Sequence, residues 1–252
     1  MTREARQCLF CDNRASTKED AWPLWLVRKF PAPVGVSIEA QRRDAPPMTW
    51  RQKGHFAKAR FACQPCNNSW MSALESAAKP IIERLFDDSP SALSEPEREI
   101  AARWVLKTAM VFEAVGGKDR FYTREERSVL RTGSIPQGYT AFWVARCVEL
   151  PGAYSAANNM FESAETLRNG VHGHVTTLAI GPIVFQVLTI RPSAAVPENA
   201  RIELPRANIE PWPRTALQLW PPTVDLVWPP EVGLRGESGV EALANRFRLE
   251  PS

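Results

Sequence analysis

The sequence lacks the features by which membrane and secreted proteins are recognised. No stretch of its 252 residues approaches the roughly 18 consecutive apolar residues that a membrane helix needs. The first residues, MTREARQ, are charged and polar, and no apolar segment follows them as it would in a secretory signal. We therefore expect a protein of the reducing cytoplasm with no membrane partner.

The net charge is also small, and its value of +3 indicates no partner. Its distribution is more informative. Residues 1–86 contain 14 Lys and Arg against 8 Asp and Glu, whereas the remaining residues contain 17 against 20. The positive charge therefore lies in the part of the chain that carries most of the cysteines.

Cysteine is scarce but strongly patterned. Four of the 5 cysteines form two Cys-x-x-Cys pairs, Cys8 with Cys11 and Cys63 with Cys66. Each pair turns the backbone tightly enough to direct two sulfurs at one ion, and two pairs complete a tetrahedron. The alternative is buried thiols or disulfides, but in a reducing compartment such cysteines bind metal. We predict a structural zinc site.

Local patterns predict an α+β fold. In the N-terminal part, apolar residues at helical spacing indicate a short helix within residues 22–30, and loose alternation over 34–61 indicates one or two hairpin strands with breaks at Pro46 and Pro47. A longer helix should run from Asn67 to about residue 86. Pro80 should kink or restart it, because proline lacks the backbone donor.

The turn-rich residues 87–96 are the candidate domain boundary, which gives two units at 1–88 and 95–252. Ser94 and Glu97 form a capping-box pattern that should open an amphipathic helix ending at Gly116-Gly117. The patterns that follow indicate a helix over 124–131, a strand over 139–148, a hairpin around Gly181-Pro182 and a short helix within 236–252.

Three further features have ordinary structural explanations. Cys147 is expected to be a core hydrophobe. His172 and His174 could be ligands through their period-two spacing, but no other liganding cluster lies near them in sequence. Trp-Pro recurs at Trp212, Trp220 and Trp228, and so much proline should exclude helix and leave an extended segment with its indoles packed on the domain. A surface that binds a partner in a larger assembly is the alternative.

Basic residues gather between the two cysteine pairs. A solvated strand face would explain them, and a surface that contacts nucleic-acid phosphates is the competing interpretation. The residues are Arg42, Arg43, Arg51, Lys53, Lys58 and Arg60.

The candidate catalytic residues are Glu19, Asp20 and Asn67. A zinc site would bring the acidic pair, which follows the first knuckle, close to the amide that follows the last cysteine. Carboxylate and amide oxygens suit a hard cation such as Mg²⁺, which leaves positions open for substrate phosphate. Asp20 could then orient or deprotonate a water. Spacing alone does not distinguish this metal site from the alternative, in which Glu19 and Asp20 merely favour the start of a helix.

The segments CLFC, STKEDAWPLWL and FACQPCNNSWMSALE resemble the HNH, or ββα-metal, endonuclease family. The likeness is to the branch in which a treble-clef-like zinc site of two Cys-x-x-Cys pairs braces the catalytic hairpin and helix, and to the four-cysteine phage enzymes that resolve branched DNA. It covers roughly residues 8–76. The resemblance implies that residues 1–88 are a zinc-binding nuclease module of prokaryotic or phage type.

Carried over by position, Glu19 matches the metal-binding acid and Asn67 matches the metal ligand at the helix start. Asp20 stands where the family usually has its histidine general base. Aspartate is a weaker base, because its reference pKa is roughly 4, so activity would be slower, depend more on the metal, or be lost. His55 could substitute from the hairpin, and Glu75 is a further candidate on the helical face of Asn67.

The resemblance implies an endonuclease that hydrolyses DNA phosphodiester bonds, with structural Zn²⁺ and catalytic Mg²⁺ or Mn²⁺. The partner would be duplex or branched DNA. Residues 95–252 would select substrate, form a homodimer or bind a partner. The alternative is a catalytically degenerate zinc-finger module that binds nucleic acid or protein.

Overall fold

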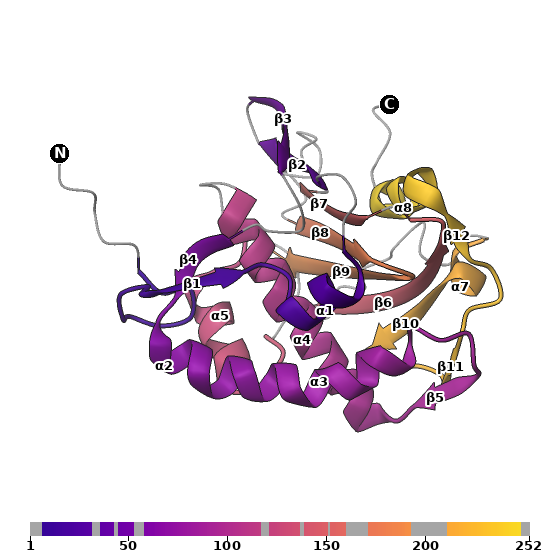
Figure 1. The fold of residues 1–252 in the computed structure, drawn as a ribbon, viewed down its shortest axis with the longest axis horizontal. Coiled ribbons are helices and arrows are strands. Elements are labelled where there is room, and N and C mark those ends of the chain that lie inside the picture. Colours follow the sequence, from indigo (N-terminus) through magenta and orange to yellow (C-terminus); the bar gives the residue numbers. More distant parts are fainter. Residues whose placement is uncertain are drawn as a thin grey trace.

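The computed structural model describes residues 7–31, 36–42, 45–52, 58–116, 121–136, 139–150, 152–159, 171–192 and 211–247. Figure 1 shows a mixed arrangement of helices and mainly antiparallel sheets. The largest sheet has eight strands, and two smaller sheets have two strands each. No helix in the described part of the chain has the length and apolar character that crossing a bilayer requires.

The N-terminal part is a two-stranded sheet followed by a helix. Strands β1 (Thr17–Asp20) and β4 (Lys58–Ala62) pair antiparallel, with Glu19 opposite Ala59. A short helix α1 (Leu24–Lys29) follows β1 and buries Leu26 and Val27. After β4 the chain continues as α2 (Gln64–Cys66), a π-helical turn η1 (Asn67–Met71) and α3 (Ser72–Arg84).

The helix predicted after Cys66 is present, and it does not restart at Pro80, which was one of the two outcomes predicted there. Pro80 lies inside α3, and the helix continues through it to Arg84. Its apolar residues Leu74, Ala78, Ile81 and Ile82 are buried along one face. Packing of this face against the core therefore outweighs the loss of one backbone hydrogen bond at the proline.

The predicted hairpin within 34–61 is present, but it belongs to the large sheet. Strands β2 (Val36–Arg42) and β3 (Ala45–Gln52) pair antiparallel, and β2 pairs in parallel with β7 (Ala153–Asn159). Pro46 and Pro47 were predicted to mark breaks, but both lie within β3. Since β3 ends the strand order, a missing backbone donor there can face away from the sheet.

The rest of the large sheet comes from the second half of the chain. The strand order of the whole sheet is β10, β6, β9, β8, β7, β2 and β3, and the short strand β12 pairs in parallel with β6. The strand predicted over 139–148 and the hairpin predicted at Gly181-Pro182 are both confirmed. The bounds are β6 (Tyr139–Val148), β8 (Val171–Ile180), β9 (Ile183–Pro192), β10 (Ala216–Trp220) and β12 (Leu234–Arg235).

Side chains alternate between the two faces of this sheet, and each face has its own helix. Phe142 and Val144 on β6 belong to a core shared with α4 (Glu95–Gly116), whereas Trp143 and Ala145 belong to a core shared with α8 (Gly236–Asn245). Buried aromatic pairs tie the first core together, for example Trp104 against Phe185 with ring centroids 5.9 Å apart. Cys147 is buried in the second core, as expected.

Both helices that follow the turn-rich segment begin with carboxylate caps. At the start of α4, the Glu97 carboxylate accepts hydrogen bonds from the Ser94 amide and hydroxyl, at 2.8 Å each. At the start of α5 (Arg124–Arg131), Thr123 and Glu126 form a complete capping box. These caps satisfy amide groups that helix geometry leaves without partners.

The Trp-Pro segment packs on the molecule as predicted, but the exclusion of helix was wrong. Residues Trp212–Thr215 form a short helix, α7. Proline is tolerated there because it occupies the first turn, where no intrahelical donor is needed. The segment then supplies the end strand β10 and the strand β11 (Leu226–Trp228), which pairs with β5 (Ser91–Leu93).

A buried arginine fastens this segment to α4. Arg98 is 3% exposed and donates hydrogen bonds to the carbonyl oxygens of Leu219, Val224 and Gln218 at 3.0, 2.6 and 2.8 Å. Trp228 is fully buried, and its indole nitrogen donates to the carbonyl oxygen of Asp87 at 3.2 Å. The segment is therefore held by its backbone carbonyls as well as by its indoles.

One continuous core spans the boundary predicted between residues 88 and 95. Trp22, from the N-terminal part, packs edge-on against Phe112 of α4 with ring centroids 5.2 Å apart. Leu74 and Ile82 of α3 belong to the same cluster of buried side chains as Val187 of β9. The two predicted units therefore share a hydrophobic core, whatever separate roles they have.

Candidate metal centre and neighbouring acid–amide pair

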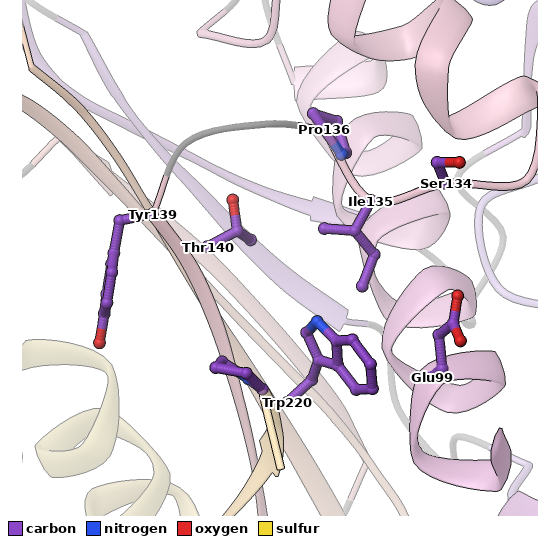
Figure 2. A pocket seen from close by; sticks show the side chains of 8 residues that line it. Glu99, Ser134, Ile135, Pro136, Tyr139, Thr140 and Trp220 are labelled. Atoms are coloured by element: carbon purple, nitrogen blue, oxygen red, sulfur yellow. The ribbon is translucent and has the colours of Figure 1, made fainter. Parts of the chain in front are cut away.

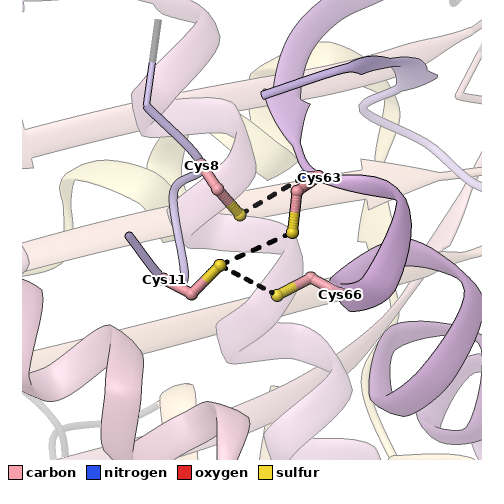
Figure 3. Close-up of side chains that lie close together, drawn as sticks. All are labelled: Cys8, Cys11, Cys63 and Cys66. Atoms are coloured by element: carbon pink, nitrogen blue, oxygen red, sulfur yellow. Dashed lines mark hydrogen bonds between the residues drawn. The ribbon is translucent and has the colours of Figure 1, made fainter. Parts of the chain in front are cut away.

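The four cysteines of the two Cys-x-x-Cys pairs converge on one point. Figure 3 shows the sulfur atoms of Cys8, Cys11, Cys63 and Cys66 pointing toward one another, and all four lie within 4.8 Å of one another. Within the described residues this is the one group of three or more Cys, His, Asp or Glu side chains placed to hold a metal ion. The site predicted from spacing could thus hold a metal such as zinc.

The sulfur spacing fits a tetrahedral zinc site. Cys11 Sγ lies 3.5 Å from Cys63 Sγ and 3.6 Å from Cys66 Sγ. Four sulfurs placed 2.3 Å from a central zinc ion would be separated from one another by about 3.8 Å. Three of the thiols are buried and Cys11 is partly buried, so solvent has little access to the cluster. The donor set of four soft thiolates is the usual one for a structural zinc ion.

Neighbouring groups already donate hydrogen bonds to these sulfurs. The backbone amide of Cys63 donates to Cys8 Sγ at 3.3 Å, and Asn13 Nδ2 donates to Cys63 Sγ at 3.8 Å. Such donors favour the charged form of a thiol and orient it. Although burial opposes the change, hydrogen bonds from the Cys66 amide and nearby thiols lower the pKa of Cys63 to about 7. Burial instead raises the pKa of Cys8 and of Cys66.

The first knuckle is fixed to the second by backbone pairing and an aromatic contact. The Leu9 amide donates to the Phe61 carbonyl oxygen at 2.7 Å, and Phe10 packs edge-on against Trp70 with centroids 4.8 Å apart. Phe10 is 2% exposed. Residues from both sides of the cysteine cluster thus hold the strand pair and the helix in a set geometry.

Next to this cluster, the structure brings Glu19 and Asn67 together. Asn67 Nδ2 donates a hydrogen bond to Glu19 Oε1 at 2.9 Å, although the residues are 48 positions apart. Glu19 lies on β1, and Asn67 is the first residue of η1, one position after Cys66. Both side chains are partly buried. The juxtaposition expected from the sequence is therefore present, with one carboxylate and one amide at the same point.

The helical run that carries Asn67 begins at Gln64 and has an unpredicted feature. Residues Asn67–Met71 form a π-helical turn between α2 and α3. Such turns are rare, occur mostly as single turns within α-helices, and are frequent at functional sites. Here the wider turn carries the amide that faces Glu19, and no pattern of residue types in the sequence indicates it.

The remaining predicted catalytic residues have different settings. Asp20 is partly buried and follows Glu19 on β1, opposite Lys58 in the strand register. Glu75 lies on α3 and is partly buried. Burial lowers the pKa of Lys107 on α4, and the negative charge of Glu75 opposes that shift. Among the described residues, no hydrogen bond or ion pair joins Glu75 to the Glu19–Asn67 pair.

The predicted basic surface is only partly described. Arg60 is exposed on β4, and the backbone of Lys58 lies on the same strand. Arg42 and Arg51 lie on β2 and β3, the hairpin that joins the large sheet. Arg43, Lys53 and His55 lie outside the described residues. Of the four described basic residues, two therefore lie on β4, beside the acid–amide pair, and two lie on the hairpin of the large sheet.

His174, considered as a ligand because of its spacing from His172, is a core residue. Its ring stacks on Phe121 with centroids 4.8 Å apart, and its Nε2 lies 3.2 Å from Thr176 Oγ1. Burial, reinforced by the positive charge of Arg191, lowers the pKa of His174 to about 3. The ring is therefore neutral at physiological pH.

Two hollows lie elsewhere on the molecule. One, of about 350 Å³, lies between α4 and the sheet, and Figure 2 shows the Trp220 indole between Thr140 and Glu99. The other, of about 370 Å³, lies against α8 and is bordered by Trp212. Neither is lined by Glu19, Asp20 or Asn67.

The chain matches no protein-family model, no curated protein and no solved structure. Its function is therefore argued from the residues and their geometry.

Proposed function

We propose that this protein is a metal-dependent endonuclease of the HNH type, which hydrolyses DNA phosphodiester bonds and carries a structural zinc ion on its four cysteines. The observation that carries the proposal is the 2.9 Å contact between Asn67 Nδ2 and Glu19 Oε1, beside the cysteine cluster. The order of elements supports it: an antiparallel strand pair, β1 with β4, leads into the continuous helical run of α2, η1 and α3, in which Asn67 is the fourth residue.

The donor set of this pair suits a divalent cation. The second carboxylate oxygen of Glu19 and the amide oxygen of Asn67 are hard ligands, and Mg²⁺ is commonly held by one or two carboxylates together with substrate phosphates and water. Glu19 and Asn67 would hold Mg²⁺ or Mn²⁺. When bound, such an ion would stabilise the negative charge that develops on the phosphate and the leaving oxygen.

The protein's own groups would supply the remaining steps. Asp20, next to Glu19 on β1, would orient the attacking water and accept its proton. The exposed guanidinium of Arg60 and the other basic residues would contact the DNA backbone, because clustered cations neutralise phosphates without reading sequence. The zinc ion would have no part in the chemistry and would fix the knuckles that bracket the pair.

A nicking assay tests this proposal. Wild-type protein should convert supercoiled plasmid to the nicked form in Mg²⁺ or Mn²⁺ and should be inactive in EDTA. Glu19→Gln and Asn67→Ala should each remove activity, and Asp20→Asn should lower it by roughly 10² to 10⁴-fold if Asp20 is the base. Asn68→Ala, which changes an exposed amide in the same turn, is the matched control and should cut normally.

A second candidate function is a zinc-bound module that binds nucleic acid or protein without cutting. The observation that favours it is Asp20, which stands where the resembled family usually has histidine. In this case, wild-type protein would bind DNA with an affinity that falls steeply with salt. It would not nick DNA under any divalent ion, and Glu19→Gln would leave its binding unchanged. That combination of results would replace the nuclease proposal.

A further inference from the structure

The region around α8 contains a buried cation that has no counterion among the described residues. Arg246, at the end of α8, is 3% exposed. Its two terminal nitrogens, Nη1 and Nη2, are both buried, and neither has a hydrogen-bond partner in the part of the chain that the structure describes. Buried charged groups are normally paired, and each exception needs an explanation such as a bound ion or ligand.

A buried network fixes the position of this guanidinium. Arg246 Nε donates a hydrogen bond to Gln186 Oε1 at 2.7 Å. The Gln186 amide nitrogen donates in turn to Thr177 Oγ1 at 3.0 Å and to the Leu243 carbonyl oxygen at 2.8 Å. Gln186 is fully buried. Because the Nε of Arg246 is used by this hydrogen bond, only its Nη1–Nη2 edge remains to bind another group.

Aromatic rings surround the guanidinium. Its central carbon lies 4.6 Å from the ring centroid of Trp143, 4.5 Å from that of Phe247 and 5.7 Å from that of Trp212. These rings stabilise a cation but cannot accept the in-plane hydrogen bonds of the free edge. Burial lowers the pKa of Arg246 to about 9, so the group remains charged at neutral pH.

A hollow of about 370 Å³ lies along the same face of α8. Gly239 and Ala242 line it, and Arg246 follows Ala242 one helical turn later. Trp212 borders both the hollow and the guanidinium. The described part of its wall is mostly apolar and includes no acidic side chain, and its lining residues are Pro211, Trp212, Thr215, Val232, Gly233, Leu234, Arg235, Ser238, Gly239 and Ala242. This volume is at the lower end of the range for small-molecule pockets, roughly 300 to 1,000 Å³.

We propose that the region around Arg246 binds a small organic carboxylate. The carboxylate group pairs with the Nη1–Nη2 edge of Arg246, and the apolar part of the ligand occupies the hollow that Trp212 borders. The planar fork of a guanidinium matches the two oxygens of a carboxylate in a bidentate pair. Because the free edge is shielded from solvent, the Trp212 indole must move aside for the ligand to enter. The site is separate from the acid–amide pair and does not depend on the proposed nuclease activity.

Thermal unfolding with defined probes tests the site. Benzoate and acetate are added to the full-length protein at equal ionic strength, with chloride and inorganic phosphate as comparison anions. At about 100 times its Kd, benzoate should raise the Tm on the order of 5 °C. Acetate should act more weakly, because it leaves the hollow empty. Arg246→Met should remove the benzoate effect, and Arg131→Met, which removes an exposed guanidinium on α5, should retain it.

Three results would overturn the proposal. Benzoate no more effective than chloride would show an unspecific salt effect, and equal stabilisation of the Arg246→Met protein would place binding elsewhere. Phosphate more effective than either carboxylate would assign the guanidinium to a phosphate ligand.

A measurement on wild-type protein covers the case in which Arg246→Met fails to fold. Benzoate should change the tryptophan fluorescence along a saturable curve, and Trp212→Phe should abolish most of that change. A linear, unsaturable response in the wild type would end the proposal without any use of the arginine variant.

Discussion

The contact between Asn67 and Glu19 makes a specific prediction about the variant Asn67→Asp. At present an amide N–H points at a carboxylate oxygen 2.9 Å away. The substitution changes almost nothing in size, but it replaces the donor with a second negative charge. In the absence of metal, the two carboxylates should repel each other and destabilise the protein. With Mg²⁺ they should form a better cation site than the wild-type pair does.

The expected destabilisation of the Asn67→Asp protein has two contributions, the lost hydrogen bond and the repulsion between the two carboxylates. A hydrogen bond to a charged group contributes about 1.5–3 kcal/mol. Two like charges about 4 Å apart in a protein surface environment repel each other by up to about 4 kcal/mol, and solvent reduces this because both side chains are only partly buried. A total of about 3 kcal/mol is reasonable. In a chain of this size it lowers the Tm on the order of 10 °C.

The assay is thermal unfolding in EDTA and in millimolar Mg²⁺. In EDTA the Asn67→Asp protein should unfold well below the wild type, and Mg²⁺ should restore most of the difference. Asn68→Asp adds the same charge at the next, exposed position, and it should show neither the loss nor the recovery. If Mg²⁺ leaves the Asn67→Asp deficit unchanged, the pair does not bind a hard cation, and the catalytic assignment of Glu19 and Asn67 loses its basis.

Three further predictions concern the metal, a buried histidine and the Trp-Pro segment. Purified protein should contain about one zinc ion per chain by elemental analysis. Cys66→Ser should lose the zinc and become sensitive to proteolysis between the knuckles, whereas Cys147→Ser should keep it. The pKa of His174 is about 3 in the folded protein and about 6.5 when the chain is unfolded, so between these pH values unfolding exposes an imidazole that takes up a proton. Stability should therefore fall by about 1.4 kcal/mol per pH unit between pH 6.5 and 3. Urea titrations should show a shallower decline for His174→Phe, and an unchanged slope would contradict the buried, neutral ring. Arg98→Met leaves three carbonyl oxygens without their donor and should cost about 3 kcal/mol or more by urea unfolding. A loss under about 1 kcal/mol would mean that water replaces the guanidinium.

The sequence predicted those elements whose patterns are local. The strand at 139–148, the hairpin at Gly181-Pro182 and the helix at 124–131 all lie where the periodicity and turn residues place them. The cysteine cluster was predictable for a similar reason, since four thiols at two fixed spacings have few other uses. Asn67 and Glu19 follow from the cluster, because each is close in sequence to one of the knuckles.

The failures come from long-range packing, which local patterns do not contain. Nothing in residues 36–52 indicates that β2 would pair with β7, since the signal lies in a strand more than a hundred positions away. Pro80 is inside a helix because Ala78, Ile81 and Ile82 are buried around it. Arg246 looked like an ordinary charge near the C-terminus, and only its aromatic surroundings and its bond to Gln186 distinguish it.

The parallel pairing of β2 with β7 has a consequence for how the chain assembles during synthesis. The cysteine knuckles and the pair β1–β4 leave the ribosome before β7 is synthesised, so they can close around an ion early. The strand that completes β2 emerges roughly a hundred residues later, which at 5–20 residues per second is a delay of about ten seconds. During that interval the hairpin has an unpaired edge, open to chaperones or to a neighbouring nascent chain. Ion uptake and sheet completion are thus two separate events in the maturation of this protein.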